Sequence, residues 1–309
     1  MTERPKRSPW RSLASLLGVA IGVAGVLFVA RTVLTRWDEV SDAFSQFDPL
    51  TLVASLALAL GGLTIIGSTW ARILRSRGPV FTTSRALSWY FTGQLGKYVP
   101  GGIWAIVGRA EMAVRAGVPR PDAYASTGVS MTTTYLASLV VVSLGSLLGW
   151  TYQVVGILIA VGLVIGFAVY AVESLHALVL RITGKFLPRG IVLTSAQDLM
   201  RFTILQVPAW ILMSLSTSVT ASAFGAEVSV ARMFFFTAAS WFIGFVAIGV
   251  PGGIGVRESV FTALATGTLG APLAVSIALA SRVVFITADV LGAVTMALVV
   301  SKTRETRPG

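Results

Sequence analysis

The pentapeptide Val-Pro-Gly-Gly-Ile occurs twice in this 309-residue sequence, at Val99–Ile103 and at Val250–Ile254. Proline lacks an amide hydrogen and glycine has the largest backbone entropy cost, so each copy interrupts a helix. The copies are separated by about half of the chain, which predicts a duplicated unit. Interrupted helices at matching positions of two halves are typical of the substrate site of a membrane transporter. The alternative is that both copies are ordinary turns between spanning helices.

Similar residues surround both copies. A glycine stands seven positions before each proline, at Gly93 and Gly244. An arginine and a glutamate follow each copy, namely Arg109 with Glu111 and Arg257 with Glu258. The repeat therefore extends beyond the five identical residues, which favours duplication over coincidence.

The composition is that of a helical membrane protein. Hydrophobic residues make up 55% of the sequence and charged residues only 12%, which excludes an ordinary soluble domain. The chain has no cysteine, so disulfides and cysteine-based metal sites are excluded. A net charge of +11 is also typical of proteins that bind nucleic acid, and the positions of the basic residues decide between the two.

Six apolar stretches are long enough to cross a bilayer, which takes about 20 residues per helix. They are Ser12–Leu34, Leu50–Leu74, Ala123–Gly149, Tyr152–Val172, Leu199–Phe224 and Pro272–Val300. Two further segments, Thr83–Gly117 and Ser229–Gly270, are broken at the Pro-Gly-Gly copies. Each half therefore reads as helix, helix, broken pair and helix. The first stretch is too long for a signal peptide, so we expect an uncleaved spanning helix.

The predicted fold class is an all-α polytopic membrane protein with six spanning helices and two re-entrant hairpins. Three spans separate the two breaks, so the second half runs opposite to the first and the repeat is inverted. We expect a single membrane domain over residues 1–309, with a first repeat at 12–149, a second, inverted repeat at 152–300 and a cytoplasmic tail at 301–309. The number of spans between the two breaks is odd whether the broken pairs are re-entrant or fully spanning, so the inversion does not decide between them. Re-entry is favoured because backbone at membrane depth is tolerated where it lines a polar cavity.

The basic residues set the orientation, because cytoplasmic segments of membrane proteins are enriched in Lys and Arg. With the N-terminus inside, the outer segments hold only Arg31, Arg36 and Arg232. The inner segments hold 17 of the 24 Lys and Arg residues: Arg4, Lys6, Arg7, Arg11, Arg72, Arg75, Arg77, Arg85, Arg115, Arg120, Arg181, Lys185, Arg189, Arg201, Lys302, Arg304 and Arg307. We therefore expect a protein of the cell membrane with both termini cytoplasmic. Its positive charge would face anionic lipid headgroups and not nucleic acid.

Six ionisable residues within the apolar segments are the candidate headgroup-binding residues. They are Arg109, Glu111, Arg257, Glu258, Arg282 and Asp289. A charge at the centre of a bilayer costs at least about 3 kcal/mol, so such residues face the protein interior and are paired. Arg282 and Asp289 are seven positions apart and share one helical face, which predicts that they pair with each other or share a third charge. The alternative role for all six is to hold the two halves together.

The hairpin tips are candidate anion sites. The tip residues are Pro100, Gly101, Gly102, Pro251, Gly252, Gly253 and Gly255. The second arm of each hairpin begins just after its tip, so a helix N-terminus with free N–H groups and a partial positive charge points into the protein there. Arg257 lies close to the second tip, which makes that tip a credible phosphate site.

Enzymatic patterns are weak. The only histidine, His176, has no cysteine or acidic cluster beside it, so a metal site or a Ser-His-Asp triad is not expected. The sequence contains no nucleotide-binding motif of the P-loop type. Asp38, Glu39, Asp42 and Asp48 lie in a predicted outer loop, where a membrane glycosyltransferase would hold a metal, but a solvated loop is the better interpretation. No cofactor is indicated.

Two segments resemble a known family. GQLGKYVPGGIWAIVGRAEMAVRAGV (Gly93–Val118) and VPGGIGVRESV (Val250–Val260) are similar to the membrane region of lysylphosphatidylglycerol synthases and of related stand-alone membrane proteins. The most specific part is Gly-Gly-x-Gly-x-Arg-Glu at Gly252–Glu258, and Pro100, Gly101 and Gly102 match more loosely. The resemblance implies a lipid flippase that moves a phospholipid from the inner to the outer leaflet. In that family the synthase activity resides in an attached cytosolic domain; because the sequence ends at Gly309, nine residues after the last predicted span, we do not expect that activity in this chain.

We therefore expect a flippase-like translocase, and no enzyme, for a phospholipid or another lipid with an anionic headgroup. Arg109 and Arg257 would bind phosphate, and Glu111, Glu258 and Asp289 would balance the arginines or meet an amine. Alternating access by rocking of the two halves is the expected mechanism. The expected partners are membrane phospholipids and the anionic headgroups of the cytoplasmic face, without nucleic acid; a homo-oligomer and a partner enzyme stay open. The alternatives are a non-transporting scaffold for an envelope enzyme and the glycosyltransferase.

The depth of the tips can be measured with single cysteines at Gly101 and Gly252 in this cysteine-free chain. Tips within the membrane predict slow reaction of both cysteines with bulky, impermeant thiol reagents, because the protein and the lipid shield them. Rapid labelling of Gly252→Cys from the cytoplasm and of Gly101→Cys from outside would show fully spanning pairs instead.

Overall fold

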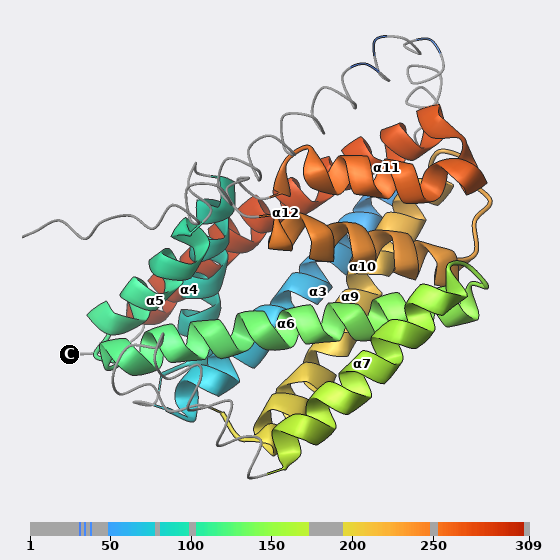
Figure 1. The fold of residues 1–309 in the computed structure, drawn as a ribbon. Helices are drawn as coiled ribbons and strands as arrows, with labels where there is room; N and C mark the ends of the chain where they lie inside the picture. Colours follow the sequence, from blue (N-terminus) through green and yellow to red (C-terminus); the bar gives the residue numbers. More distant parts are fainter. Residues whose placement is uncertain are drawn as a thin grey trace, which may run out of the picture.

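The computed structural model describes residues 49–77, 81–98, 103–172, 194–247 and 253–305, and the single residues Arg31, Leu34 and Asp38. The regular structure in these ranges is entirely helical (Figure 1). The helices are α3 (Pro49–Arg75), α4 (Thr83–Leu95), the short 3-10 helix η1 (Gly96–Tyr98), α5 (Trp104–Arg115), α6 (Arg120–Leu148), α7 (Gln153–Ala171), α9 (Ala196–Ser222), α10 (Val230–Val246), α11 (Val256–Leu269) and α12 (Ala271–Glu305).

Five of these helices are long and apolar enough to cross a membrane, namely α3, α6, α7, α9 and α12. They coincide with five of the six predicted spans, which confirms the all-α polytopic fold class. The sixth, Ser12–Leu34, lies almost entirely outside the described residues, as does most of the acidic outer loop. The helix α12 continues beyond Val300, the predicted end of the last span, to Glu305. The polar residues that follow the apolar stretch are compatible with a helix even though they do not belong in lipid.

The centre of the bundle is the crossing of α3 and α9, which pack along much of their length. The α3 backbone approaches α9 closely at Gly62, where a Cβ atom would lie 2.8 Å from the carbonyl oxygen of Ala209. Hydroxyl groups add hydrogen bonds between the two helices: Ser55 Oγ donates to the carbonyl oxygen of Ser216 at 2.8 Å, and Ser216 Oγ donates back to the carbonyl oxygen of Ser55 at 2.8 Å. Small residues and hydroxyls of this kind bring membrane helices together where no hydrophobic effect acts between them.

Both broken segments fold as pairs of packed helices, as predicted, and these pairs are called the first and the second hairpin. In the first, α4 and η1 pack against α5, and in the second α10 packs against α11. Figure 1 shows the two pairs in different parts of the bundle, with α12 running behind and contacting α4 on one side and α11 on the other. The tip residues Pro100, Gly101, Gly102, Pro251 and Gly252 lie outside the described residues. Two helices therefore contact both pairs: α12 through α4 and α11, and α6 through α5 and α10.

Helix α7 lies at the edge of the bundle, where it packs mainly on α6. The close side contains Gly156, whose missing side chain makes room for Ser146. The opposite side exposes a continuous set of apolar side chains, including Val154, Ile157, Leu158, Val161, Val164 and Ile165. Such a surface is stable in hydrocarbon and not in water, which supports the assignment as an integral membrane protein.

The close α3–α9 crossing predicts a large difference between two glycine substitutions. Gly62→Val would force the α9 backbone away, whereas Gly162→Val on α7 meets open space. Overpacking of this kind costs about 1–3 kcal/mol, so the Tm in detergent should fall by several degrees for Gly62→Val and stay close to that of the unchanged protein for Gly162→Val. Equal Tm values for the two variants would contradict the crossing.

Candidate functional site

A cavity of about 300 Å³ lies between the two helical pairs. Residues of α4, η1 and α5 form one wall, α9 and α10 form the opposite wall, and α3 and α6 contribute the remaining lining. Ile103, at the start of α5, lines the cavity and is also 55% exposed. The cavity therefore reaches the protein surface beside the first hairpin.

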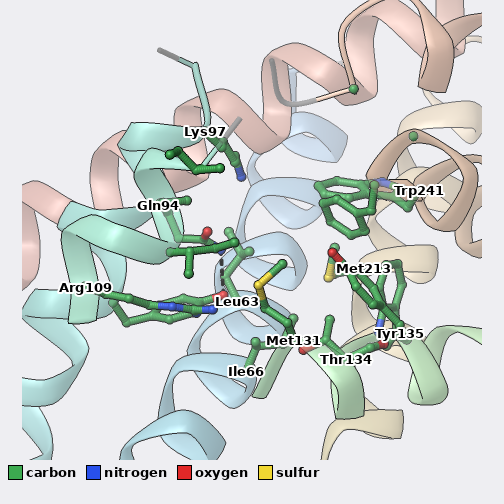
Figure 2. Close-up of a pocket in the computed structure, with 18 of the residues that line it drawn as sticks. Leu63, Ile66, Gln94, Lys97, Arg109, Met131, Thr134, Tyr135, Met213 and Trp241 are labelled. Carbon is green, nitrogen blue, oxygen red and sulfur yellow. Dashed lines mark hydrogen bonds between the residues drawn. The ribbon is translucent and has the colours of Figure 1, made fainter. Parts of the chain in front are cut away.

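The two walls differ in chemistry, as Figure 2 shows. The first pair contributes polar and cationic side chains, with Gln94, Lys97 and Arg109 on one side of the space. The opposite side carries Trp241, Tyr135 and Met213, and Met131 lies between the two sides. Trp210 and Phe245 complete an aromatic cluster around Trp241, with ring centroids 5.2–6.4 Å apart. An amphipathic cavity of this kind suits a ligand with one charged end and one apolar end.

Arg109 is the principal charge on the cavity wall. It is only 7% exposed and lies beside the rings of Trp70 and Tyr90, with its guanidinium carbon 5.7 and 5.8 Å from their centroids. Among the described residues it forms no ion pair, and its Nε has no hydrogen-bond partner. Aromatic faces stabilise a cation by only about 0.5–2 kcal/mol, which is less than a buried charge costs. The site is therefore short of one anion.

The sequence predicted that Glu111 would balance Arg109, and the structure corrects this. Glu111 instead accepts hydrogen bonds from Arg120 Nη2 at 3.1 Å and from the Tyr124 hydroxyl at 2.7 Å. The reason is geometric, because residues two positions apart point to nearly opposite sides of a helix. Glu111 thus forms a surface pair away from the cavity.

Lys97 and Asp289 form a buried ion pair beside the cavity. Lys97 Nζ lies 2.6 Å from Asp289 Oδ2, and the Tyr98 hydroxyl donates to the same oxygen at 2.6 Å. Asp289 is 0% exposed, and its Oδ1 has no hydrogen-bond partner within the described ranges. The pair connects η1 in the first hairpin to α12. Lys97 also lines the cavity, so its ammonium group borders both Asp289 and the open space.

Arg282 connects the second hairpin to α12 in the same way. Its Nη1 donates to Glu258 Oε1 at 3.1 Å, while Glu258 Oε2 accepts the N–H of Gly255 at 2.7 Å. The predicted pairing of Arg282 with Asp289 is therefore wrong, since each residue has a different partner. Seven residues along a helix correspond to about 10.5 Å, which is too far for direct contact, and the neighbouring hairpins supply closer charges.

Arg257 lies outside the cavity, although it is as buried as Arg109 at 7% exposed. Its guanidinium carbon is 3.8 Å from the centroid of Trp241 and 5.0 Å from that of Phe285. Within the described residues it has no carboxylate ion pair. Because Trp241 lines the cavity, the indole ring lies between Arg257 and the open space.

The two tips also differ in how their helices begin. The N-terminus of α11 is already occupied by the Glu258 carboxylate, since Gly255, at φ +80°, presents its N–H to that side chain. The N-terminus of α5 has no side-chain cap, and its cap residue Ile103 lines the cavity. Both tips border the cavity, since Gly253 of the second tip lines it together with Ile103 at the start of α5.

A shared contact shows that the two hairpins are built alike. A Cβ atom at Gly93 would lie 2.9 Å from the Cβ of Arg109, and one at Gly244 would lie 3.1 Å from the Cβ of Arg257. Each glycine therefore allows the second arm to approach the first at its arginine. The position of these glycines seven residues before each proline was the sequence signal for this contact.

Sequence reasoning missed Lys97, Tyr98 and Trp241 as site residues. Lys97 and Tyr98 directly precede the first Val-Pro-Gly-Gly copy, so their closeness to the tip was the available signal. The second copy has no lysine at the corresponding position, so comparison of the two copies did not single out Lys97. Trp241 carried no signal, because a tryptophan in an apolar helix is common.

The Glu258–Arg282 pair predicts strong coupling in a double-mutant cycle. Removing either partner of a buried pair costs about 3–5 kcal/mol because it leaves the other charge unbalanced, so Glu258→Gln and Arg282→Gln should each destabilise the protein and the double variant should recover part of the loss. The exposed pair of Glu111 with Arg120 is the control and should couple by less than about 1 kcal/mol. Unfolding in detergent measures all variants, and additive losses at Glu258 and Arg282 would contradict the pairing.

Comparison with known proteins gives one result. The family model described as lysylphosphatidylglycerol synthase TM region matches residues 15–291, which include both hairpins, the cavity and most of α12. Among curated proteins, none matches the sequence. Because the match covers most of the chain and the helical architecture agrees with it, this integral membrane protein belongs to the lysylphosphatidylglycerol synthase TM-region family.

Proposed function

We propose that this protein is a membrane lipid translocase that moves a phospholipid, or another lipid with an anionic headgroup, between the two leaflets. The observation that carries the proposal is Arg109, a buried arginine without a carboxylate partner among the described residues, on the wall of a 300 Å³ cavity. A lipid phosphate bound there would supply the missing negative charge and the acceptors for the guanidinium.

The shape and lining of the cavity support a lipid in preference to a free anion. Leu63, Ile66, Met131 and Met213 line it together with the aromatic cluster, so most of its surface is unsuited to a hydrated ion. The opening at Ile103 is also apolar. A headgroup could occupy the cationic wall while its acyl chains leave through this opening into the bilayer.

The family supports the same class of function. Its name refers to the membrane region of enzymes that make a phospholipid, lysylphosphatidylglycerol, so a relation to membrane lipids is expected for this chain. Of the lipid headgroup, the site specifies the phosphate group. The proposal is transport without covalent chemistry, in the cell membrane and with both termini cytoplasmic.

The mechanism follows from the likeness of the two hairpins. We propose that the two halves form an inverted repeat and that Arg109 and Arg257 are equivalent anion ligands. In the present conformation Arg109 borders the cavity and Trp241 covers Arg257. Rocking of the halves would cover Arg109 and uncover Arg257, so that the headgroup meets one arginine on each side of the bilayer.

Translocation is testable in proteoliposomes that contain acyl-labelled fluorescent phosphatidylglycerol, with dithionite to quench the outer leaflet. Arg109→Gln should slow lipid movement at least about tenfold, because a buried charge partner is worth 2 kcal/mol or more. Arg109→Lys should keep partial activity, since it keeps the charge and loses the two-pronged geometry. Arg257→Gln should also be impaired if the headgroup is passed to Arg257.

The matched control is Arg115→Gln, which removes an exposed arginine from the same helix α5 and should move lipid at the unchanged rate. The Tm of every variant is measured on the same preparations, so that loss of folding is separated from loss of transport. Full activity in a stable Arg109→Gln protein would contradict the phosphate assignment. No lipid movement in the unchanged protein would favour the scaffold alternative.

A further inference from the structure

We infer that the cavity selects a headgroup with a single negative charge, that is a phosphodiester, over a doubly charged phosphomonoester and over a zwitterion. The inference rests on the proposed function in taking a lipid as the ligand. It specifies the class of lipid from the charges that surround the cavity, and these can be altered one at a time.

The charges at the cavity wall sum to +1. Among the described residues, the ionisable side chains with a formal charge that line the cavity are Lys97 and Arg109, and the carboxylate in contact with them is Asp289, 2.6 Å from Lys97. Transfer of a proton between Lys97 and Asp289 leaves this sum unchanged, because it converts an ion pair into a neutral pair. The sum therefore does not depend on where that proton lies.

The other buried charges nearby do not line the cavity. Arg257 lies behind the Trp241 ring, and Arg282 is paired with Glu258 and lies 5.8 Å from the centroid of the Tyr98 ring. Glu111 and Arg120 pair with each other at the surface. The remaining polar groups on the cavity wall, which include Gln94, Tyr90 and Thr134, are uncharged hydrogen-bonding groups. Arg109 is thus the unbalanced positive charge that a ligand in the cavity contacts directly, while the Trp241 ring separates the ligand from Arg257.

One unbalanced positive charge is matched by one negative charge. A phosphodiester carries a single charge, whereas a phosphomonoester carries close to two at pH 8, because its second pKa is about 6. A dianion would leave one negative charge unbalanced in the cavity, and a zwitterion would leave Arg109 as it is. An unbalanced charge in a poorly hydrated site is costly, so binding is strongest where the charges cancel.

The test compares three lipids with the same short dioctanoyl chains at pH 8 in a neutral detergent: phosphatidylglycerol as the diester, phosphatidic acid as the monoester and phosphatidylcholine as the zwitterion. Relative dissociation constants come from the bound fractions in native mass spectrometry. The unchanged protein should bind phosphatidylglycerol at least roughly tenfold more tightly than either other lipid, given the strength of charge interactions at this depth.

The variants then change the net charge of Lys97, Arg109 and Asp289 by known amounts. Asp289→Asn raises it to +2 and should shift the preference to phosphatidic acid. Lys97→Gln lowers it to zero and should remove the preference for phosphatidylglycerol over phosphatidylcholine. The double variant of Lys97→Gln with Asp289→Asn returns it to +1 and should restore the original preference; it also avoids an unbalanced buried charge, so it is the variant most certain to fold. Glu227→Gln, on an exposed loop, is the control and should change nothing.

Three results would overturn the inference: a preference for phosphatidic acid in the unchanged protein, an unchanged preference for phosphatidylglycerol in Asp289→Asn, or loss of that preference in the double variant. Inorganic phosphate, added as a competitor at millimolar concentration, separates a lipid from a free anion. It should not displace phosphatidylglycerol, and displacement would assign the site to free phosphate.

Failure of this inference is distinct from failure of the proposed function. If binding follows the charge series while proteoliposomes show no lipid movement, the selectivity stands and the translocase proposal fails. If lipid movement depends on Arg109 while binding ignores the charge series, the translocase proposal stands and the selectivity fails.

Discussion

A charge inside a membrane protein needs an opposite charge within a few ångströms, and this requirement organises the centre of the molecule. Lys97 and Glu258 belong to different hairpins, and each finds its partner on α12, at Asp289 and Arg282 respectively. The same helix therefore holds both hairpins by buried ion pairs. Arg109 is the residue of the cavity wall that this arrangement leaves without a partner among the described residues, and for that reason the candidate site is defined by electrostatics as much as by shape.

The two hairpins are alike in backbone and unlike in charge. Both bring a glycine of the first arm against an arginine of the second, so the contact between the arms is the same. The second hairpin has a glutamate directly after its arginine, which caps α11 and binds Arg282. In the first hairpin the glutamate comes two positions after the arginine and points to the surface. Glu258 is three residues after the N-cap Gly255 and can therefore cap α11, whereas Glu111 is eight residues after the N-cap Ile103 and cannot reach the start of α5.

The sequence predicted the architecture well because the signals for it are local. Apolar length locates α3, α6, α7, α9 and α12, and the Pro-Gly-Gly copies locate both helical pairs. The partners of the charged residues are contacts between distant segments, and neither hydropathy nor spacing encodes them. Arg282 and Asp289 share a helix face, as predicted, but the choice between each other and residues of the hairpins depends on how the hairpins pack on α12. Trp241 lines the cavity because of that packing, which no local pattern in the sequence indicates.

The length of α12 has a consequence for how the protein responds to its lipid surroundings. Its candidate membrane span, Ala271–Lys302, has 32 residues and is about 48 Å long at 1.5 Å per residue, while the hydrocarbon core of a bilayer is about 30 Å thick. A helix with this mismatch tilts or projects from the membrane, and the balance shifts with bilayer thickness at a cost of fractions of a kcal/mol per ångström. Since α12 is attached to both hairpins, a change of its tilt moves both of them together. We therefore expect thinner and thicker bilayers to favour different separations of the cavity walls, so that bilayer thickness would act on the protein without any ligand.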